Sequence, residues 1–258
     1  MEFQFLSLFL RQIYTKAAMS TKQTYTYRHP HPAVTTDCVV FGYDMNGGLS
    51  VLLIQRGAAP YRGRWAIPGG FLEMNEDAMS CARRELMEET GLEISSLEEI
   101  GSFSEVDRDP RERVVSIAFF TLSCTRPVKG SDDAAQARWF PVKEVPPLAF
   151  DHGKILEKAL SCLRERFHRC PVGLDILPET FTISELKDLY EAILEKKLDT
   201  RSFKATILKQ GLLREMEGNP NDSGKFFSTQ YRFNRDRYHD LESRGGFRLQ
   251  FKSGREWI

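Results

Sequence analysis

Apolar residues recur with the period of β-strands through much of residues 36–140. Two such runs, DCVVFGYD and LSVLLIQR, flank Asn46-Gly47-Gly48, and these residues tolerate the positive φ angles of a tight hairpin turn. A third run, RVVSIAFFTLSC, predicts a long strand further along the chain. The pattern therefore predicts a hairpin and at least one more strand in the first half of the protein.

Two helices are predicted around these strands. The first spans about residues 75–90, where Asn75 is the expected N-cap and Gly91 ends the helix. The second covers DHGKILEKALSCLRERF, residues 151–167. Strands on both sides of one helix predict an α/β domain, which we place at residues 24–168.

The pattern changes after residue 168. HRCPVGLDILPET lacks periodicity and carries two prolines, as expected of a linker. Thr182 and Glu185 then have the spacing of a capping box at the start of an amphipathic helix, and a second, shorter helix ends at Gly211. KFFSTQYRF alternates as a half-buried strand does. This order of elements predicts a winged-helix domain over residues 169–258.

Composition and cysteine content indicate an ordinary soluble protein. The chain has 258 residues, of which 41% are hydrophobic, and its five cysteines form no Cys-x-x-Cys pair. We expect buried thiols in a reducing cytoplasm, without disulfides or a zinc site. No run approaches the roughly 20 apolar residues of a membrane span, so no membrane partner is expected. The apolar start lacks the basic flank of a secretory signal, so we expect residues 1–23 to be a disordered extension, with the natural start at Met19.

The first predicted helix concentrates acidic residues in a chain whose formal net charge is zero. Glu85, Glu88 and Glu89 are three and four residues apart and therefore share one face of the helix. Two interpretations are open. The carboxylates form a solvated acidic face, or they share Mg²⁺ or Mn²⁺, which prefer hard oxygen ligands. Arg84 lies four residues before Glu88, at the right spacing to hold that carboxylate in position.

The spacing of these residues resembles the Nudix box. All nine specified positions match: Gly70, Glu76, Arg84, Glu85, Leu86, Glu88, Glu89, Gly91 and Leu92. The resemblance implies an α/β/α sandwich around a mixed sheet and cleavage of a diphosphate linked to a second moiety. It also implies that Glu85, Glu88 and Glu89 bind Mg²⁺, with Mn²⁺ as the alternative. Arg84 would orient these carboxylates, and Gly70 would contribute a backbone carbonyl oxygen or a close approach.

The catalytic base is less clearly indicated than the metal ligands. Glu85 or Glu89 is the expected base within the box, because a carboxylate must accept the proton of the attacking water. Related enzymes sometimes use a glutamate from a loop outside the box. Glu105 and Glu112 are the corresponding loop candidates in this chain.

The resemblance extends from about residue 24 to residue 167 and bears on the substrate. DRDPRERVVSIAFF is similar to the segment after the box in ADP-ribose pyrophosphatase-like members. This similarity implies ADP-ribose or a related nucleoside diphosphate derivative as the substrate. Arg108 and Arg111 belong either to a structural turn in this segment or to a phosphate-binding site, and the sequence leaves both alternatives open.

The end of the chain is basic. Residues 201–258 carry 12 Lys or Arg against 7 Asp or Glu, a balance that permits contact with nucleic acid. Residues 172–252 resemble the winged-helix extension of Nudix-related transcriptional regulators, in which a Nudix domain senses a small ligand such as ADP-ribose. The resemblance implies duplex DNA as a partner and a homodimer. Arg201 and Lys204 of the short helix either face the phosphate backbone or are ordinary solvated residues, and Lys225 is the main basic residue of the expected wing.

Two functional hypotheses therefore stand side by side. The first is a Mg²⁺-dependent Nudix hydrolase, and the second is a ligand-responsive transcription regulator. The intact box favours hydrolysis, because many regulators of this group have a degraded box. A wing that reads DSGKFF in place of the expected Gly-Arg-Pro counts against DNA binding, whereas a whole second domain supports it. The two functions are compatible in one chain.

Overall fold

The computed structural model describes residues 25–94, 96–129, 134–169, 172–174, 176–216, 229–243, 249–254 and 256–257. The expected disordered extension over residues 1–23 lies outside these ranges. Contacts divide the chain into a segment Met1–His31 and a compact unit Pro32–Ile258, and the described helices and strands belong to the second unit. Within the described ranges, no helix is long and apolar enough to cross a membrane.

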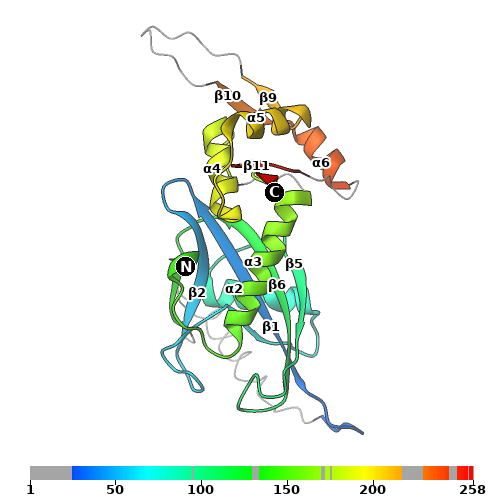
Figure 1. The fold of residues 1–258 in the computed structure, drawn as a ribbon. Coiled ribbons are helices and arrows are strands. Elements are labelled where there is room, and N and C mark those ends of the chain that lie inside the picture. The colour runs from blue at the N-terminus through cyan, green and yellow to red at the C-terminus, as the bar shows by residue number, and fades with distance from the viewer. Residues whose placement is uncertain are drawn as a thin grey trace, which may run out of the picture. The chain divides into compact units, whose positions relative to one another are not determined.

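Seven strands form one mixed sheet, as the Nudix resemblance implies (Figure 1). Strand β1 (Ala33–Asp44) is parallel to β6 (Val114–Cys124) and antiparallel to β2 (Gly48–Arg56). Shorter strands extend the sheet from these three: β3 (Trp65–Ala66) and β7 (Ala134–Pro141) pair with β2, β4 (Gly69–Phe71) pairs with β1, and β5 (Glu98–Phe103) pairs with β6.

The predicted hairpin turn joins β1 to β2. Asp44 Oδ1 accepts hydrogen bonds of 2.8 Å from the backbone N–H groups of both Asn46 and Gly47. Gly48 has a φ of 74°, a conformation that glycine adopts without steric cost. The hairpin is therefore confirmed, and its register pairs Asp44 with Gly48.

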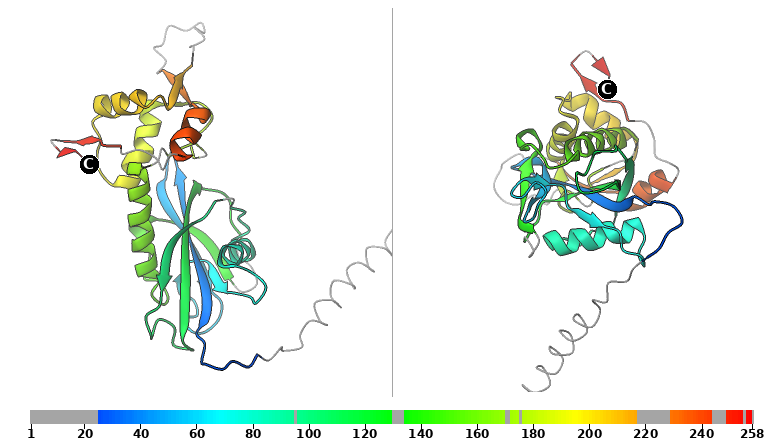
Figure 2. Two further views of the ribbon diagram at one scale, coloured as in Figure 1. Left: turned by 90° about the vertical axis from the view of Figure 1, so that its right-hand side faces the viewer. Right: turned by 90° about the horizontal axis from the view of Figure 1, so that it is seen from below.

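Helices cover both faces of the sheet. Helix α2 (Ala78–Thr90) packs its Ala82 and Leu86 against one face, and α3 (His152–Arg169) packs residues such as Ile155 and Ala159 against the other. Alternate residues of β1 pack into the hydrophobic cores on the two faces, because successive side chains of a strand point in opposite directions. Both views of Figure 2 show α2 and α3 on opposite sides of the strands. The predicted α/β/α sandwich is confirmed.

The N-cap of helix α2 lies two residues later than predicted. Asp77, and not Asn75, is the N-cap, and its Oδ1 accepts a 2.7 Å hydrogen bond from the backbone N–H of Ser80. The residue before it, Glu76, is held outside the helix by its contacts with Arg84 and with the backbone N–H of Glu73. The predicted end is confirmed, because Gly91 has a φ of 71° and donates its N–H to the carbonyl oxygen of Met87.

The C-terminal region has the predicted winged-helix order. Thr182 and Glu185 form the capping box that begins α4 (Ile183–Leu194), and α5 (Thr200–Lys209) follows. A three-stranded sheet accompanies them in the order β8 (Phe181–Thr182), β10 (Gln230–Phe233) and β9 (Leu213–Glu215). Three further elements were not predicted: α6 (Arg235–Ser243), β11 (Lys252–Ser253) and β12 (Glu256–Trp257).

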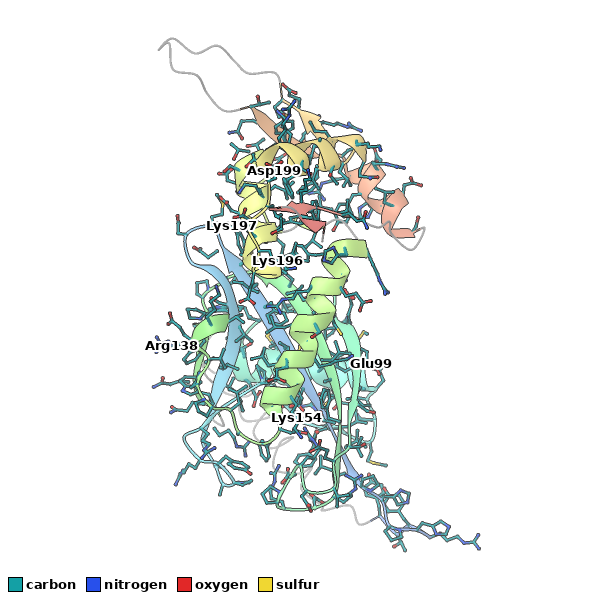
Figure 3. All side chains as sticks on the ribbon, in the orientation of Figure 1. Glu99, Arg138, Lys154, Lys196, Lys197 and Asp199 are labelled. Carbon is teal, nitrogen blue, oxygen red and sulfur yellow. The ribbon has the colours of Figure 1, made fainter. Side chains whose placement is uncertain are left out.

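A buried carboxylate fixes the connection between α4 and α5. Glu191 accepts hydrogen bonds from Lys187 Nζ at 2.8 Å, Lys197 Nζ at 2.7 Å and the backbone N–H of Leu198 at 2.8 Å. These donors outweigh the cost of burial and lower the pKa of Glu191 to about 2. Figure 3 shows Lys197 and Asp199, the N-cap of α5, at this connection.

Helix α3 contacts both the mixed sheet and the winged helix. Near its C-terminal end, the Phe167 ring lies 4.8 Å from the Tyr190 ring of α4, centroid to centroid. Arg164 Nε donates to the carbonyl oxygen of Ile193 at 3.1 Å. The backbone N–H of Leu249 donates to the carbonyl oxygen of His168 at 2.7 Å. The expected domain boundary after residue 168 falls at the end of this helix and stays a prediction.

Candidate active site

A cavity of about 400 Å³ opens where β1, β2 and β4 meet the C-terminal end of α2. The loop 104–113 and the first residue of α3 complete its wall. Of the described glutamates, Glu89 lines this cavity. Sequence segments that lie far apart in the chain thus converge beside one carboxylate of the Nudix-like helix.

The two glycines of β4 allow the sheet and the acidic helix to approach closely. A Cβ atom on Gly69 would lie 2.0 Å from the carbonyl oxygen of Thr36 in β1. A Cβ atom on Gly70 would lie 2.3 Å from the carboxylate of Glu85 in α2. Any larger residue would collide with backbone at the first position and displace the Glu85 carboxylate at the second, so the glycines are a steric requirement of this site.

Arg84 connects three carboxylates of the box. Its Nη1 donates to Glu85 at 2.7 Å and to Glu88 at 3.3 Å, and its Nη2 donates to Glu76 at 2.6 Å. The hydrogen bonds from Arg84 lower the pKa of Glu76 to about 2. The expected orientation of Glu88 by Arg84 agrees with this geometry, whereas the contact with Glu76 was not foreseen.

Glu89 has a different environment from the other two acidic residues of the predicted metal site. Its Oε2 accepts a 2.9 Å hydrogen bond from the backbone N–H of Gly69, and burial raises its pKa from the ordinary 4.5 to about 8. Burial also raises the pKa of Glu85. The Glu88 side chain is 61% exposed. The site therefore holds two partly buried carboxylates whose ionised forms are stabilised by a nearby positive charge.

The donor set fits a hard divalent cation. In the parts of the chain that the structure describes, no three carboxylate, thiolate or imidazole groups already converge on one point. Arg84 instead bridges Glu85 and Glu88. A divalent cation at Glu85 and Glu89 would offset the burial of both carboxylates, and carboxylate oxygens are the ligands that Mg²⁺ prefers.

The raised pKa of Glu89 predicts a pH-dependent stability in the metal-free protein. A carboxyl group whose pKa is higher in the folded state than in the unfolded state adds to the free energy of unfolding. This contribution is complete below the pKa of the unfolded state, near 4.5, and is lost as the pH rises toward 8. The free energy of urea unfolding in EDTA should therefore fall for the wild type relative to Glu89→Gln between pH 5 and pH 8. A constant difference across this range would contradict the burial of an ionisable Glu89.

Arg108 lies in a buried ion-pair network. Its Nε and Nη2 donate to the two oxygens of Asp151 at 3.0 and 2.8 Å, and Nη2 also contacts Asp37 at 3.3 Å. The Arg108 residue is 7% exposed. These contacts are those expected of a structural residue, the first of the two alternatives for Arg108. Phosphate binding by Arg108 stays a prediction.

Arg111 is more accessible than Arg108. It pairs with Asp109 through Nε and Nη2, the latter at 2.7 Å, and its side chain remains 40% exposed and lines the cavity. Of the two loop candidates for the catalytic base, Glu105 instead pairs with Lys154 at the start of α3, labelled in Figure 3. Neither Glu105 nor Glu112 is among the described residues that line the cavity.

Sequence reasoning missed several residues of the cavity. Arg56, Asp37, Phe150 and His152 all line it. His152 Nδ1 accepts a 2.9 Å hydrogen bond from the backbone N–H of Ile67, so its proton lies on Nε2, which faces Asp37 Oδ1 at 3.5 Å. The one local signal for Arg56 is its place as the last residue of a buried strand, directly before a glycine.

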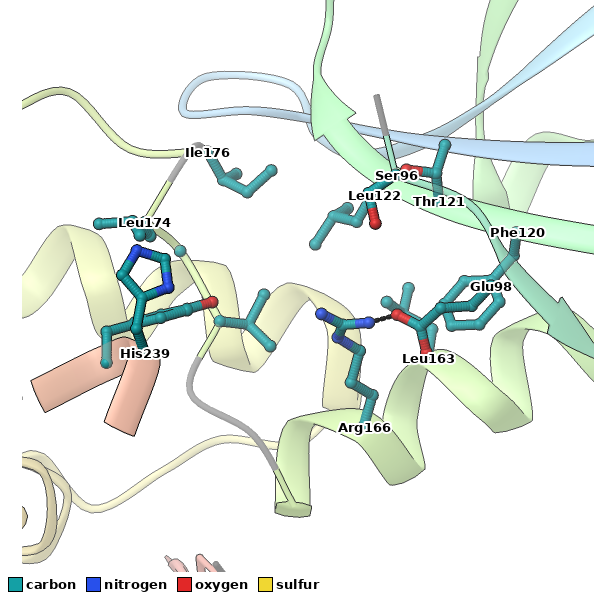
Figure 4. A pocket seen from close by; sticks show the side chains of 13 residues that line it. Ser96, Glu98, Phe120, Thr121, Leu122, Leu163, Arg166, Leu174, Ile176 and His239 are labelled. Atoms are coloured by element: carbon teal, nitrogen blue, oxygen red, sulfur yellow. Dashed lines mark ion pairs between the residues drawn. The ribbon is translucent and has the colours of Figure 1, made fainter. Parts of the chain in front are cut away.

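A second cavity of about 290 Å³ lies between the mixed sheet and the C-terminal region. Strands β5 and β6 and helix α3 form one side, and residues 172–174, Ile176 and α6 form the other (Figure 4). An ion pair between Glu98 of β5 and Arg166 of α3 lies at its wall. This cavity contains none of the predicted site residues.

The predicted DNA-binding residues of α5 are accessible. Arg201 and Lys204 are both exposed, and Lys204 Nζ lies 5.8 Å from the centroid of the Tyr231 ring in β10. Lys225 lies outside the described residues. The two α5 residues therefore present positive charge to solvent on the helix that the winged-helix resemblance assigns to DNA.

Comparisons with known proteins agree with this architecture. Residues 31–159 match the NUDIX domain model, and residues 173–233 match the NrtR DNA-binding winged helix domain model. The ADPR responsive transcriptional repressor NtrR of Acinetobacter baylyi is 31% identical over 210 residues, which cover 80% of this chain and 83% of that protein. The ADP-ribose pyrophosphatase of Methanocaldococcus jannaschii is 38% identical over 155 residues, 59% of this chain and 87% of that protein.

A solved structure is similar across both parts of the chain. Shewanella oneidensis NrtR complexed with a 27mer DNA superposes with a TM-score of 0.64 at 25% identity, covering 85% of this chain and 99% of that one. Family models, relatives and fold thus agree on the same two-part organisation. The chain belongs to the Nudix family and, like NrtR, joins its Nudix domain to a C-terminal winged helix domain.

Proposed function

We propose that this protein is a Mg²⁺-dependent hydrolase that cleaves the diphosphate of ADP-ribose or of a related nucleoside diphosphate derivative. The observation that carries this proposal is the position of Glu89, a partly buried carboxylate that lines the cavity beside Gly69 and Gly70. The complete box, which Arg84 holds together, supports the same conclusion. The similarity to a relative named ADP-ribose pyrophosphatase indicates the substrate class.

Each residue of the box has a defined task in this proposal. Glu85, Glu88 and Glu89 hold Mg²⁺ together with the backbone of Gly70, and Arg84 keeps Glu85 and Glu88 oriented. When bound, Mg²⁺ offsets the negative charge of the diphosphate, which otherwise repels an incoming nucleophile. Glu89 is the favoured proton acceptor of the two candidates in the box, because its carboxylate lines the cavity, whereas Glu85 is not among the described residues that line it.

The experiment is a product assay on the purified full chain with ADP-ribose and Mg²⁺. Cleavage of the diphosphate by water yields AMP and ribose 5-phosphate, which chromatography separates and quantifies. EDTA should abolish product formation, and Mg²⁺ added back should restore it. Absence of turnover across ADP-ribose and related nucleoside diphosphate derivatives would refute the hydrolase proposal.

A second candidate function is ligand-responsive DNA binding. The observation that favours it is the winged helix, with Arg201 and Lys204 exposed on α5. The Acinetobacter relative, which this chain matches over most of its length, is named as an ADPR responsive repressor, and the similar Shewanella protein was solved with DNA. Regulation through paired DNA half-sites would also require a homodimer, which analytical ultracentrifugation of the full chain tests.

Replacing Arg201 and Lys204 together by alanine should weaken binding to duplex DNA from upstream of the protein's own gene. Each lost phosphate contact removes about one unit from the slope of log affinity against log salt, so the slope should fall by about two. Hydrolysis should be unchanged. The matched control is the pair Lys143→Ala and Lys158→Ala, exposed lysines of the Nudix domain. Equal salt dependence in wild type and the α5 variant would refute the assignment of α5 to DNA.

A further inference from the structure

Two arginines from separate segments meet at one aromatic ring in the cavity. Arg56, the last residue of β2, has its Cζ atom 4.7 Å from the centroid of the Phe150 ring. Arg111, in the loop 104–113, has its Cζ atom 5.8 Å from the same centroid and 5.3 Å from that of Phe71. Both arginines line the cavity that Glu89 also lines.

We propose that Arg56 and Arg111 form a guanidinium clamp that binds the phosphoryl groups of the ligand, with Phe150 setting the spacing between them. This inference rests on the proposed function, from which it takes the class of ligand, a nucleoside diphosphate derivative. It assigns to Arg56 a part in substrate positioning that the sequence did not indicate.

The charge balance at the clamp favours an anion. Within the described part of the chain, the Arg56 side chain makes one hydrogen bond, from Nε to the carbonyl oxygen of Pro60 at 2.8 Å, and no ion pair with a carboxylate. Its terminal nitrogens therefore remain available to a ligand. Burial, and after it the positive charge of Arg111, lowers the pKa of Arg56. Two like charges held together in a partly buried cavity are stabilised when an anion lies between them.

Guanidinium groups match the chemistry of phosphate. Arginine offers parallel N–H donors that bind two phosphoryl oxygens at once, and such charge-assisted bonds are stronger than neutral ones. Arg111 commits Nε and Nη2 to Asp109, which fixes the plane of its guanidinium group. A cavity of about 400 Å³ is large enough for the phosphoryl groups and part of a nucleoside.

The backbone around Phe150 is strained in a way that fixes the ring. Phe150 has a φ of 51° and Tyr61 a φ of 63°, in the left-handed region that residues other than glycine seldom adopt. The two rings meet edge to face, with centroids 4.8 Å apart, and the Phe150 ring lies 5.3 Å from that of His152. Strain of this kind is concentrated at functional sites, where surrounding contacts maintain it.

The position of the clamp brings phosphate to the carboxylate of the box. Arg56, Arg111 and Glu89 line one cavity, so a phosphoryl group bound by the two arginines lies in the same space as that carboxylate. Arg108 is less suited to the same task, because it is 7% exposed and pairs with two carboxylates, Asp151 and Asp37, whereas Arg111 pairs with one and its side chain is 40% exposed. The clamp therefore places the bond to be cleaved beside Glu89, with Arg108 in the wall of the same cavity.

The test measures binding to the full-length protein in EDTA, where hydrolysis is suppressed, by isothermal titration calorimetry. Arg56→Ala and Arg111→Ala should each weaken ADP-ribose binding by about 10- to 100-fold, as expected for lost charge-assisted hydrogen bonds. Adenosine, which lacks phosphate, should bind wild type and variants equally. Arg56→Lys should recover little, because lysine lacks the parallel donors. The matched control is Arg64→Ala, since Arg64 stacks on Tyr61 with its Cζ atom 5.6 Å from the centroid and does not line the cavity.

Inorganic pyrophosphate separates failure of the clamp from failure of the proposed function. Wild-type protein that binds pyrophosphate through Arg56 and Arg111, but does not bind ADP-ribose, would keep the clamp and refute ADP-ribose as ligand. ADP-ribose binding that survives in both alanine variants would overturn the clamp and leave the hydrolase proposal in place. Absence of pyrophosphate and ADP-ribose binding in the wild type would overturn the clamp as well.

Discussion

Replacing Glu89 by glutamine should keep the fold and lower the Mg²⁺-dependent turnover of ADP-ribose by about two orders of magnitude or more. The glutamine side-chain oxygen still accepts the hydrogen bond that the backbone N–H of Gly69 donates to Glu89 at 2.9 Å. The substitution removes one negative charge from the predicted metal site, and with it the favoured proton acceptor in the cavity. Glu88→Gln should have an effect in the same direction through the metal alone.

The measurement is kcat and KM at several Mg²⁺ concentrations, with circular dichroism to establish that the variant is folded. A weakened metal site should raise the Mg²⁺ concentration needed for half-maximal turnover, whereas a lost base lowers kcat even at saturating Mg²⁺. The matched control is Glu93→Gln, an exposed glutamate just beyond the end of α2. Turnover equal to that of wild type in Glu89→Gln would exclude Glu89 from both the metal site and proton transfer.

The parts of the fold that were predicted from sequence depend on local chemistry. The hairpin follows from Asn46-Gly47-Gly48, and the end of α2 follows from Gly91, because both positions need positive φ angles that few residues tolerate. The capping box of α4 follows in the same way from Thr182 and Glu185. The Nudix box likewise keeps Glu85, Glu88 and Glu89 within a single helix, so their spacing alone brought these three residues together.

The start of α2 shows where local chemistry is insufficient. Asn75 and Asp77 are both good N-cap residues, so propensity does not choose between them. The choice depends on Glu76, which Arg84 and the backbone of Glu73 hold outside the helix. Strand β5 was missed for a related reason, since EEIGSF lacks a regular alternation of apolar and polar residues. Helix α6, with the polar sequence RDRYHDLES, carries too weak an apolar pattern to predict.

The cavity itself could not be predicted, because its residues are brought together by the sheet. Arg56 ends β2, Phe150 precedes α3 and Arg111 lies in a loop, and nothing in the sequence near any of them indicates the others. Arg108 and Arg111 are close in sequence and lie in contrasting surroundings. One is 7% exposed and paired with two aspartates, whereas the side chain of the other is 40% exposed.

The buried network around Arg108 should make a large contribution to stability. Replacing Arg108 by methionine, which keeps much of the side-chain volume, leaves Asp37 and Asp151 buried without their shared cation. Breaking a buried ion pair from one side costs about 3–5 kcal/mol, because the remaining charge is uncompensated. Asp37 retains contacts with Ser116 and His152, but Asp151 loses both of its hydrogen bonds from Arg108, at 3.0 and 2.8 Å.

Urea unfolding of four variants, Arg108→Met, Asp151→Asn, their double variant and a control, tests this explanation. Arg138→Met, at an exposed arginine of β7, is the matched control and should change the free energy of unfolding by no more than about 0.5 kcal/mol. The double variant Arg108→Met, Asp151→Asn should lose less than the sum of its single changes, because the second substitution removes the uncompensated charge that the first creates. Additive losses would mean that Arg108 stabilises the fold through packing of its side chain and not through its charge. In that case Asp37 and Asp151 would be stabilised by other groups of the cavity, with His152 as the first to test.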